Sequence, residues 1–82
     1  MTISLERSTL LTIFYITLLD YVGGLAPIYI GRATAGAATS DPAWQIQRMT
    51  YDANNNPLNV LFANGTNGFT NVWDRRTQYT YS

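Results

Sequence analysis

One polar run, at residues 52–57, reads D-A-N-N-N-P and matches the opening D-x-N-x-N ligands of a calcium-binding loop. A loop of that kind next needs a glycine for its sharp turn and a bidentate carboxylate at its end. Pro57 stands in the glycine position and Ala63 in the carboxylate position. We therefore interpret this run as a polar turn, and we predict no metal site and no cofactor.

A second polar cluster, Asp74 followed by Arg75 and Arg76, has the residue types of a catalytic or anion-binding group. The chain has no histidine and no cysteine, so the commonest general base and the thiolate nucleophile are both missing. No second carboxylate is close in the sequence to complete an acid–base pair. We therefore predict no catalytic residue and no enzymatic activity, and we expect Arg75 or Arg76 to pair with an acidic residue of a neighbouring subunit.

Aromatic side chains near both ends of the second half, including Trp44 and Trp73, have faces that can stack on sugars or nucleobases. The five cations are all arginines, they are balanced by five carboxylates, and they form no basic stripe. Nucleic-acid binding depends on such a stripe, so we expect no nucleic-acid partner. Sugar binding stays open as an alternative to core and interface packing.

The size of the chain points to association. It has 82 residues, room for one domain, and such a domain buries only about 60–65% of its unfolded surface. Without cysteine it has no disulfide to stabilise a small core. Charged residues make up 12%, about half the usual share, and lysine is absent. Arginine and tyrosine are enriched at interfaces and lysine is depleted there, so we expect a subunit of a larger symmetric assembly.

The N-terminal third contains an apolar run, residues 9–22, with almost no charge. A membrane helix needs about 20 apolar residues. This run is shorter and contains Asp20, so a membrane partner is not expected, although a short membrane-active protein is one rival interpretation. Its β-branched and aromatic residues favour a strand, whereas its leucines and aromatics recur at helical spacing. We predict that residues 1–27 form an apolar arm, as either a strand or a helix.

The rest of the chain, residues 28–82, is predicted to be a small β-rich domain. Alternating apolar residues and Asn-rich or Gly-rich turns are typical of antiparallel strands. The fold class is thus mainly β, a small antiparallel sheet or sandwich with the N-terminal arm. The predicted elements are a strand at 28–32, a loop at 33–42, a hairpin of 44–51 and 58–63, a turn at 64–68, a turn or single helical turn at 69–76 and a final strand at 77–82.

A series of short motifs runs from Tyr29 to the C-terminus. They are Y-I-G-R-A at 29–33, T-S and W-Q-I within 39–46, Y-D-A-N-N-N-P-L at 51–58, A-N-G at 63–65, F-T-N-V-W-D-R-R at 69–76 and Y-T-Y-S at 79–82. In this order they resemble a family of small tailed-bacteriophage virion structural proteins. The resemblance covers about two thirds of the chain. Asn64 and Arg75 stand where relatives have aspartate, which changes the local charge.

The resemblance implies a virion component of the head, neck or tail and carries no active site. We expect a non-catalytic structural subunit of the neck or tail, present in multiple copies. The alternatives are a capsid cement or decoration protein and a module that recognises a host glycan or a partner protein. The expected partners are copies of the chain and other virion proteins, and the expected location is the virion, assembled in the host cytoplasm. The interface candidates are aromatic and arginine residues: Tyr29, Arg32, Trp44, Arg48, Phe69, Trp73, Arg75, Arg76, Tyr79 and Tyr81.

Overall fold

Five strands and one short 3-10 helix make up the fold of residues 14–82. The computed structural model describes residues 14–82, and the part of the predicted arm at 1–13 lies outside the described residues. The elements are β1 (Tyr15–Asp20), β2 (Tyr29–Thr34), β3 (Pro42–Tyr51), β4 (Pro57–Phe62), β5 (Asn71–Val72) and η1 (Trp73–Arg75). The predicted mainly β class is confirmed, and the helical turn predicted within 69–76 is η1.

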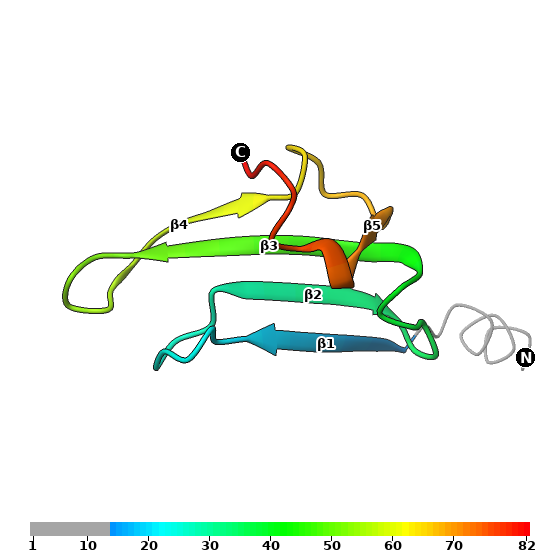
Figure 1. The fold of residues 1–82 in the computed structure, drawn as a ribbon, viewed down its shortest axis with the longest axis horizontal. Helices are drawn as coiled ribbons and strands as arrows, with labels where there is room; N and C mark the ends of the chain where they lie inside the picture. Colours follow the sequence, from blue (N-terminus) through cyan, green and yellow to red (C-terminus); the bar gives the residue numbers. More distant parts are fainter. Residues whose placement is uncertain (1–13) are drawn as a thin grey trace, which may run out of the picture.

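The strands form one antiparallel sheet in the order β1-β2-β3-β4, and β5 pairs with the start of β3 (Figure 1). β1 pairs along its whole length with β2, from Tyr15 opposite Thr34 to Asp20 opposite Tyr29. From Tyr15 to Asp20 the apolar run is therefore a strand, as its β-branched and aromatic residues favoured. The boundary predicted at residue 27 falls within the turn that joins β1 to β2.

The β3–β4 hairpin is the clearest agreement between sequence and structure. In its turn, the Asp52 carboxylate accepts hydrogen bonds from the backbone N–H groups of Asn54 (2.8 Å) and Asn56 (2.9 Å). Asn55 adopts a φ of 63°, a conformation that asparagine tolerates better than most residues. The run at 52–57 is therefore a polar turn whose carboxylate is already engaged, as predicted.

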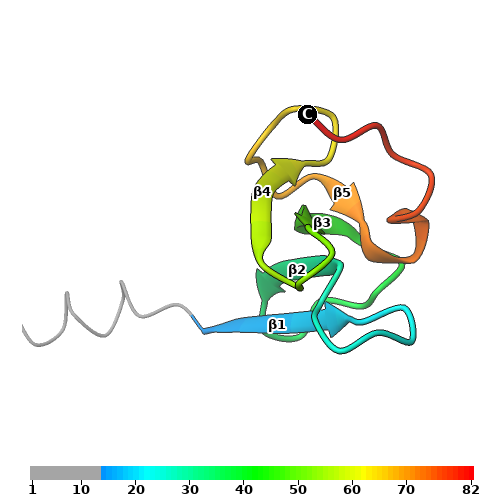
Figure 2. The same cartoon turned by 90° about the vertical axis from the view of Figure 1, so that its left-hand side faces the viewer.

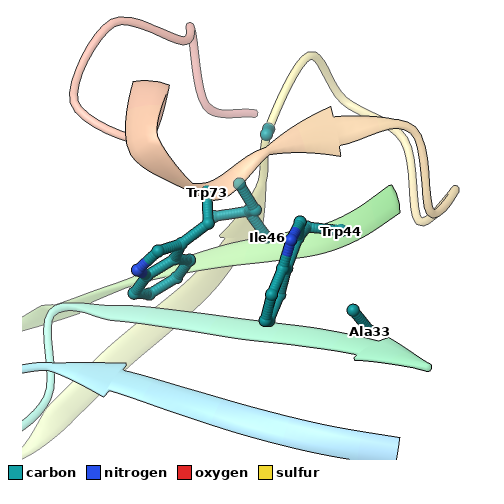
Figure 3. Close-up of a cluster of buried hydrophobic side chains, with 5 residues drawn as sticks. Ala33, Trp44, Ile46 and Trp73 are labelled. Atoms are coloured by element: carbon teal, nitrogen blue, oxygen red, sulfur yellow. The ribbon is translucent and has the colours of Figure 1, made fainter. Parts of the chain in front are cut away.

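The core lies on one face of the sheet, between the strands and the segment that contains β5 and η1 (Figure 2). Figure 3 shows Trp44 and Ile46 projecting from β3 toward Trp73, with Ala33 beside them. The two indole rings lie 5.9 Å apart between centroids at an interplanar angle of 38°. Two tryptophans thus fill most of a core that would otherwise be small for a sheet of this length.

The C-terminal residues correct one prediction. In place of a strand at 77–82, there is a turn followed by a single bridge between Ala63 and Tyr81. Ser82 and Phe62 exchange two backbone hydrogen bonds, and Asn64 N–H donates to the carbonyl of Thr80 (2.7 Å). Because the segment meets only the last residues of β4, it has too little strand edge to pair with over its predicted length.

Candidate functional site

The two faces of the sheet differ in what covers them. Along β1, Ile16 and Leu18 are half-buried on the core face, whereas Tyr15, Thr17 and Leu19 are exposed on the opposite face. Successive side chains of a strand point to opposite faces, so this alternation extends across the sheet. We call the face of the sheet opposite the core the open face. On β1 it carries Tyr15, Thr17 and Leu19.

One end of the open face carries an aromatic pair with a cation. The ring of Tyr15 lies 5.9 Å from that of Phe69, which belongs to the loop before β5, and the Arg32 guanidinium lies 5.2 Å from the Tyr15 ring centroid. The amide of Gln45 donates to the carbonyl of Asn67 (2.8 Å) and ties the same loop to β3. Both Arg32 and Phe69 are among the predicted interface candidates, and both lie beside the Tyr15 ring at the surface.

Several other large apolar side chains of the described residues are exposed, on β1, on β4 and in the connecting segments. The highest exposed fraction is that of Leu25, at 89%, in the turn between β1 and β2. The exposed large apolar residues are Phe14, Tyr15, Leu19, Tyr21, Val22, Leu25, Leu58, Val60 and Phe69.

The outer edge of β1 lies beside the exposed side chains of Tyr15 and Leu19. In an antiparallel pair, alternate residues direct both backbone groups to the neighbouring strand. The N–H of Ala35 donates to the carbonyl of Phe14 (2.8 Å), so Phe14 and every second residue after it face β2. The backbone groups of Tyr15, Thr17 and Leu19 therefore point outward, where no strand from the described part of the chain pairs with them.

Trp44 and Trp73, two further interface candidates, lie in the core of the chain itself. Their exposed fractions are 0% and 7%. The Trp44 indole N–H also donates to the carbonyl of Ala38 (2.9 Å). Their rings are thus covered without any partner, and neither ring is free to stack on a sugar.

Three tyrosines among the candidates support the C-terminal segment. Tyr29 and Tyr81 have ring centroids 5.7 Å apart, and the Tyr81 hydroxyl donates to the carbonyl of Arg76 (2.7 Å). The Tyr79 hydroxyl accepts a hydrogen bond from the N–H of Val72 (2.8 Å). Burial, together with the neighbouring Tyr29 and Tyr79, raises the pKa of Tyr81 to about 12. All three are half-buried, so each contributes to the fold and keeps some exposed surface.

The arginine candidates separate into engaged and exposed side chains. Arg76 Nε lies 2.7 Å from Asp20 Oδ2, and its guanidinium lies 4.7 Å from the Trp73 ring centroid. The hydrogen bonds from Arg76 and from the backbone of Val22 hold the pKa of Asp20 below its ordinary value. Arg76 therefore joins η1 to β1 within one chain, whereas Arg48 and Arg75 are exposed.

Other kinds of site can be checked in the described residues. Residues 14–82 contain no group of three or more acidic side chains placed to hold a metal ion, and they enclose no pocket. Between Phe14 and Ser82, no helix has the length and apolarity to cross a membrane. The strongest surface feature of this part is therefore the open face with the β1 edge.

The residues that sequence reasoning missed are the exposed apolar residues of β1 and of the turn after it. Their segment was predicted as part of an apolar arm, but no individual residue of it was singled out. The signal was the strand pattern of residues 15–20, in which every second side chain points to the same face. Which of the two faces is exposed can be decided only when the face that packs on the core is known. Comparison of the chain with family models, with curated proteins and with solved structures gives no match.

Proposed function

We propose that this protein is a non-catalytic structural subunit that assembles in multiple copies, as a neck or tail component of a tailed-bacteriophage particle. The observation that carries the proposal is the pair of exposed apolar side chains, Tyr15 and Leu19, on the open face beside a strand edge that no strand of residues 14–82 pairs with. An unpaired edge is a template for another strand, and exposed apolar surface gains free energy when a partner covers it. The motifs from Tyr29 to the C-terminus supply the assignment to a phage particle.

The surface charge supports the same proposal. Balanced charges, an absence of lysine and few charged residues overall weaken the repulsion that keeps soluble proteins apart. On the open face, Arg32 is held against the Tyr15 ring, an arrangement suited to an interface because arginine is weakly hydrated. A capsid cement protein is compatible with these features as well, and the neutral surface favours the neck or tail over an exposed decoration.

A glycan-recognition module is less well supported. Its main basis in the sequence was the pair Trp44 and Trp73, whose rings are buried in the core. The exposed aromatic rings that remain are Phe14, Tyr15, Tyr21 and Phe69, and the paired rings of Tyr15 and Phe69 stand beside an arginine. Sugar sites usually combine an aromatic face with several polar groups, and protein contact suits this composition better.

The test is the mass of the recombinant full chain in solution, measured by light scattering at several concentrations. We expect a discrete oligomer or a mass that rises with concentration. As a matched pair of variants, Leu19→Lys places a charge on the open face and should lower the mass, whereas Gln78→Lys, at an exposed site after η1, should not. A folded monomer at every concentration would contradict the proposal.

A further inference from the structure

Two asparagines of the segment between β4 and β5 are followed by glycine, at Asn64–Gly65 and Asn67–Gly68 (Figure 1). An asparagine loses its side-chain amide when the backbone nitrogen of the next residue attacks its Cγ, an intramolecular reaction that depends on how the two groups are oriented. Glycine in the next position favours the attack, because it has no side chain to block the approach. By sequence the two pairs are equivalent, whereas their surroundings in the structure differ.

The first pair is fixed by hydrogen bonds. Asn64 has a φ of 57°, and its N–H donates to the carbonyl of Thr80 (2.7 Å). Its side-chain amide donates to Oδ1 of the buried Asn71 (3.2 Å). The N–H of Gly65 donates to the carbonyl of Phe62 (3.0 Å). The nitrogen that would attack and the amide that would leave are both engaged, so this pair is held away from the geometry of the reaction.

The second pair has different partners. Asn67 is exposed, and no residue of the described part of the chain hydrogen-bonds its side-chain amide. Its carbonyl accepts a hydrogen bond from Gln45 Nε2 (2.8 Å), and the Gly68 N–H donates to Thr66 Oγ1 (3.1 Å). The attacking group is the Gly68 nitrogen without its proton, and the negative charge of that nitrogen is shared with the Asn67 carbonyl oxygen. A donor aimed at that oxygen stabilises the anion, as the donors of an oxyanion hole do.

We propose that Asn67 is a site of spontaneous deamidation promoted by Gln45, whereas Asn64 is protected. The inference goes beyond the proposed function and does not depend on it. The Gly68 nitrogen bonds Cγ of Asn67 as its proton passes through the Thr66 hydroxyl to water, which a hydroxyl allows because it both accepts and donates. The Cγ–Nδ2 bond breaks, and the amide nitrogen takes up a proton and leaves as ammonia. Water then opens the cyclic imide at either carbonyl, which gives aspartate or isoaspartate.

The product carries a new charge near the open face. Gln45, whose amide bonds the Asn67 carbonyl, lies opposite Arg32 in the register of β2 and β3. Within the described part of the chain the one ion pair joins Arg76 to Asp20, so Arg32 has no carboxylate partner there. Deamidation adds a carboxylate to a chain whose five arginines are balanced by five carboxylates. The modified chain therefore has a net negative charge, in the loop that Gln45 ties to the side of the sheet where Arg32 lies.

Incubation of the full chain in mildly alkaline buffer, followed by peptide mass spectrometry, measures the reaction at each asparagine, because deamidation exchanges NH₂ for OH. In the folded chain we expect Asn67 to react roughly tenfold faster than Asn64, whose attacking and leaving groups are both hydrogen-bonded. Aspartate and isoaspartate should both form at Asn67, since the cyclic imide opens at either carbonyl. In urea the two sites should react at similar rates, because only the folded structure distinguishes them.

A matched pair of variants tests the part played by Gln45. Gln45→Met removes the donor and keeps the length of the side chain, so it should slow the reaction at Asn67 about threefold to tenfold in the folded chain and not in urea. Gln47→Met, on the same face of β3, should leave the rate unchanged. Circular dichroism checks that both variants keep the sheet.

Three results would overturn the inference or a part of it. Equal rates at Asn64 and Asn67 in the folded chain, or reaction at Asn67 in urea alone, would overturn the site. Aspartate without isoaspartate would overturn the route through a cyclic imide. A folded Gln45→Met that reacts at least as fast as the parent chain would overturn the role of Gln45.

Discussion

The ring of Trp73 occupies the space directly above Gly31. A β-carbon built on Gly31 would lie 2.4 Å from Cε3 and 2.5 Å from Cζ3 of that ring, and 3.2 Å from Cε3 of Trp44. β2 therefore needs a residue without a side chain at the point where η1 crosses it. Since Arg76 and Trp44 flank the Trp73 ring, the ring has little room to move aside.

We expect Gly31→Ala to lower the free energy of unfolding by about 1–2 kcal/mol. Alanine normally favours a strand over glycine by about 0.5–1 kcal/mol, but forcing a carbon against a packed ring costs about 1–3 kcal/mol. Urea unfolding followed by tryptophan fluorescence measures the change. Gly68→Ala is the control, because its nearest neighbour would be Thr66 Oγ1 at 3.4 Å. Equal stability of the two variants would contradict the packing of Trp73 on β2.

The pair of Asp20 and Arg76 predicts a loss of stability in acid. The pKa of Asp20 is below its ordinary value in the folded chain, because Arg76 and the Val22 N–H bond its carboxylate. The unfolded state therefore takes up a proton first, so this stabilisation is present above about pH 4 and is lost as the pH falls through the folded pKa. Asp20→Asn should lower the free energy of unfolding by about 1 kcal/mol at pH 7. It should also make that free energy depend less steeply on pH below pH 4.

Urea unfolding at pH 7 and at pH 3 measures this effect. In Asp20→Asn the loss of stability in acid should be smaller but still present. Hydrogen bonds from Asn56 also lower the pKa of Asp52, so that carboxylate still makes stability fall in acid. Asp74→Asn removes the same charge from an exposed position and serves as the control. If both variants lose equal stability at pH 7, the Asp20–Arg76 pair has no special role.

Tyr81 predicts a loss of stability at the alkaline end. Its pKa rises from 10.0 to about 12 on folding, chiefly because the phenol is buried. Above pH 10 the unfolded state releases this proton first, so stability falls as the pH rises from 10 toward 12. Tyr81→Phe removes the hydrogen bond to the Arg76 carbonyl, so it should lower the free energy of unfolding by about 1 kcal/mol at pH 7. Above pH 10 the stability of this variant should fall less steeply than that of the parent chain. Tyr21→Phe, at 42% exposure, should match the parent chain in a pH series of thermal unfolding.

The turn at 52–57 predicts that calcium does not change the thermal stability of the protein. Both oxygens of Asp52 are used: Oδ1 accepts from the N–H groups of Asn54 and Asn56, and Oδ2 accepts from the Asn56 amide at 3.1 Å. Adding calcium or a chelator should therefore leave the thermal midpoint unchanged, whereas Asp52→Ala should lower it by opening the turn. A calcium-dependent rise in the midpoint that Asp52→Ala abolishes would instead show a metal site.

The hairpin and the mainly β class were predictable, because alternation and turn residues are local signals. Trp44 and Ile46 alternate with glutamines, and asparagines mark the turn. The role of Gly31 was not predictable, since it depends on Trp73, a contact distant in sequence. The same holds for Arg76, whose partner Asp20 comes from the other end of the chain. The strand expected at 77–82 was wrong because local alternation does not show whether a neighbouring edge is free to pair.

A half-buried leucine of β1, Leu18, can be compared with an exposed leucine of the turn that follows, Leu25. Leu18 is half-buried against the core, whereas Leu25 is 89% exposed in the turn after β1. Leu18→Ser should lower the free energy of unfolding of the monomer by about 2 kcal/mol through lost burial. Leu25→Ser should change it by less than about 0.5 kcal/mol, because exposed substitutions seldom affect folding. Light scattering should show weaker association for Leu25→Ser despite its intact fold, since that side chain gains its cover only from a second copy. Unchanged association of Leu25→Ser would exclude this turn from the contact between copies.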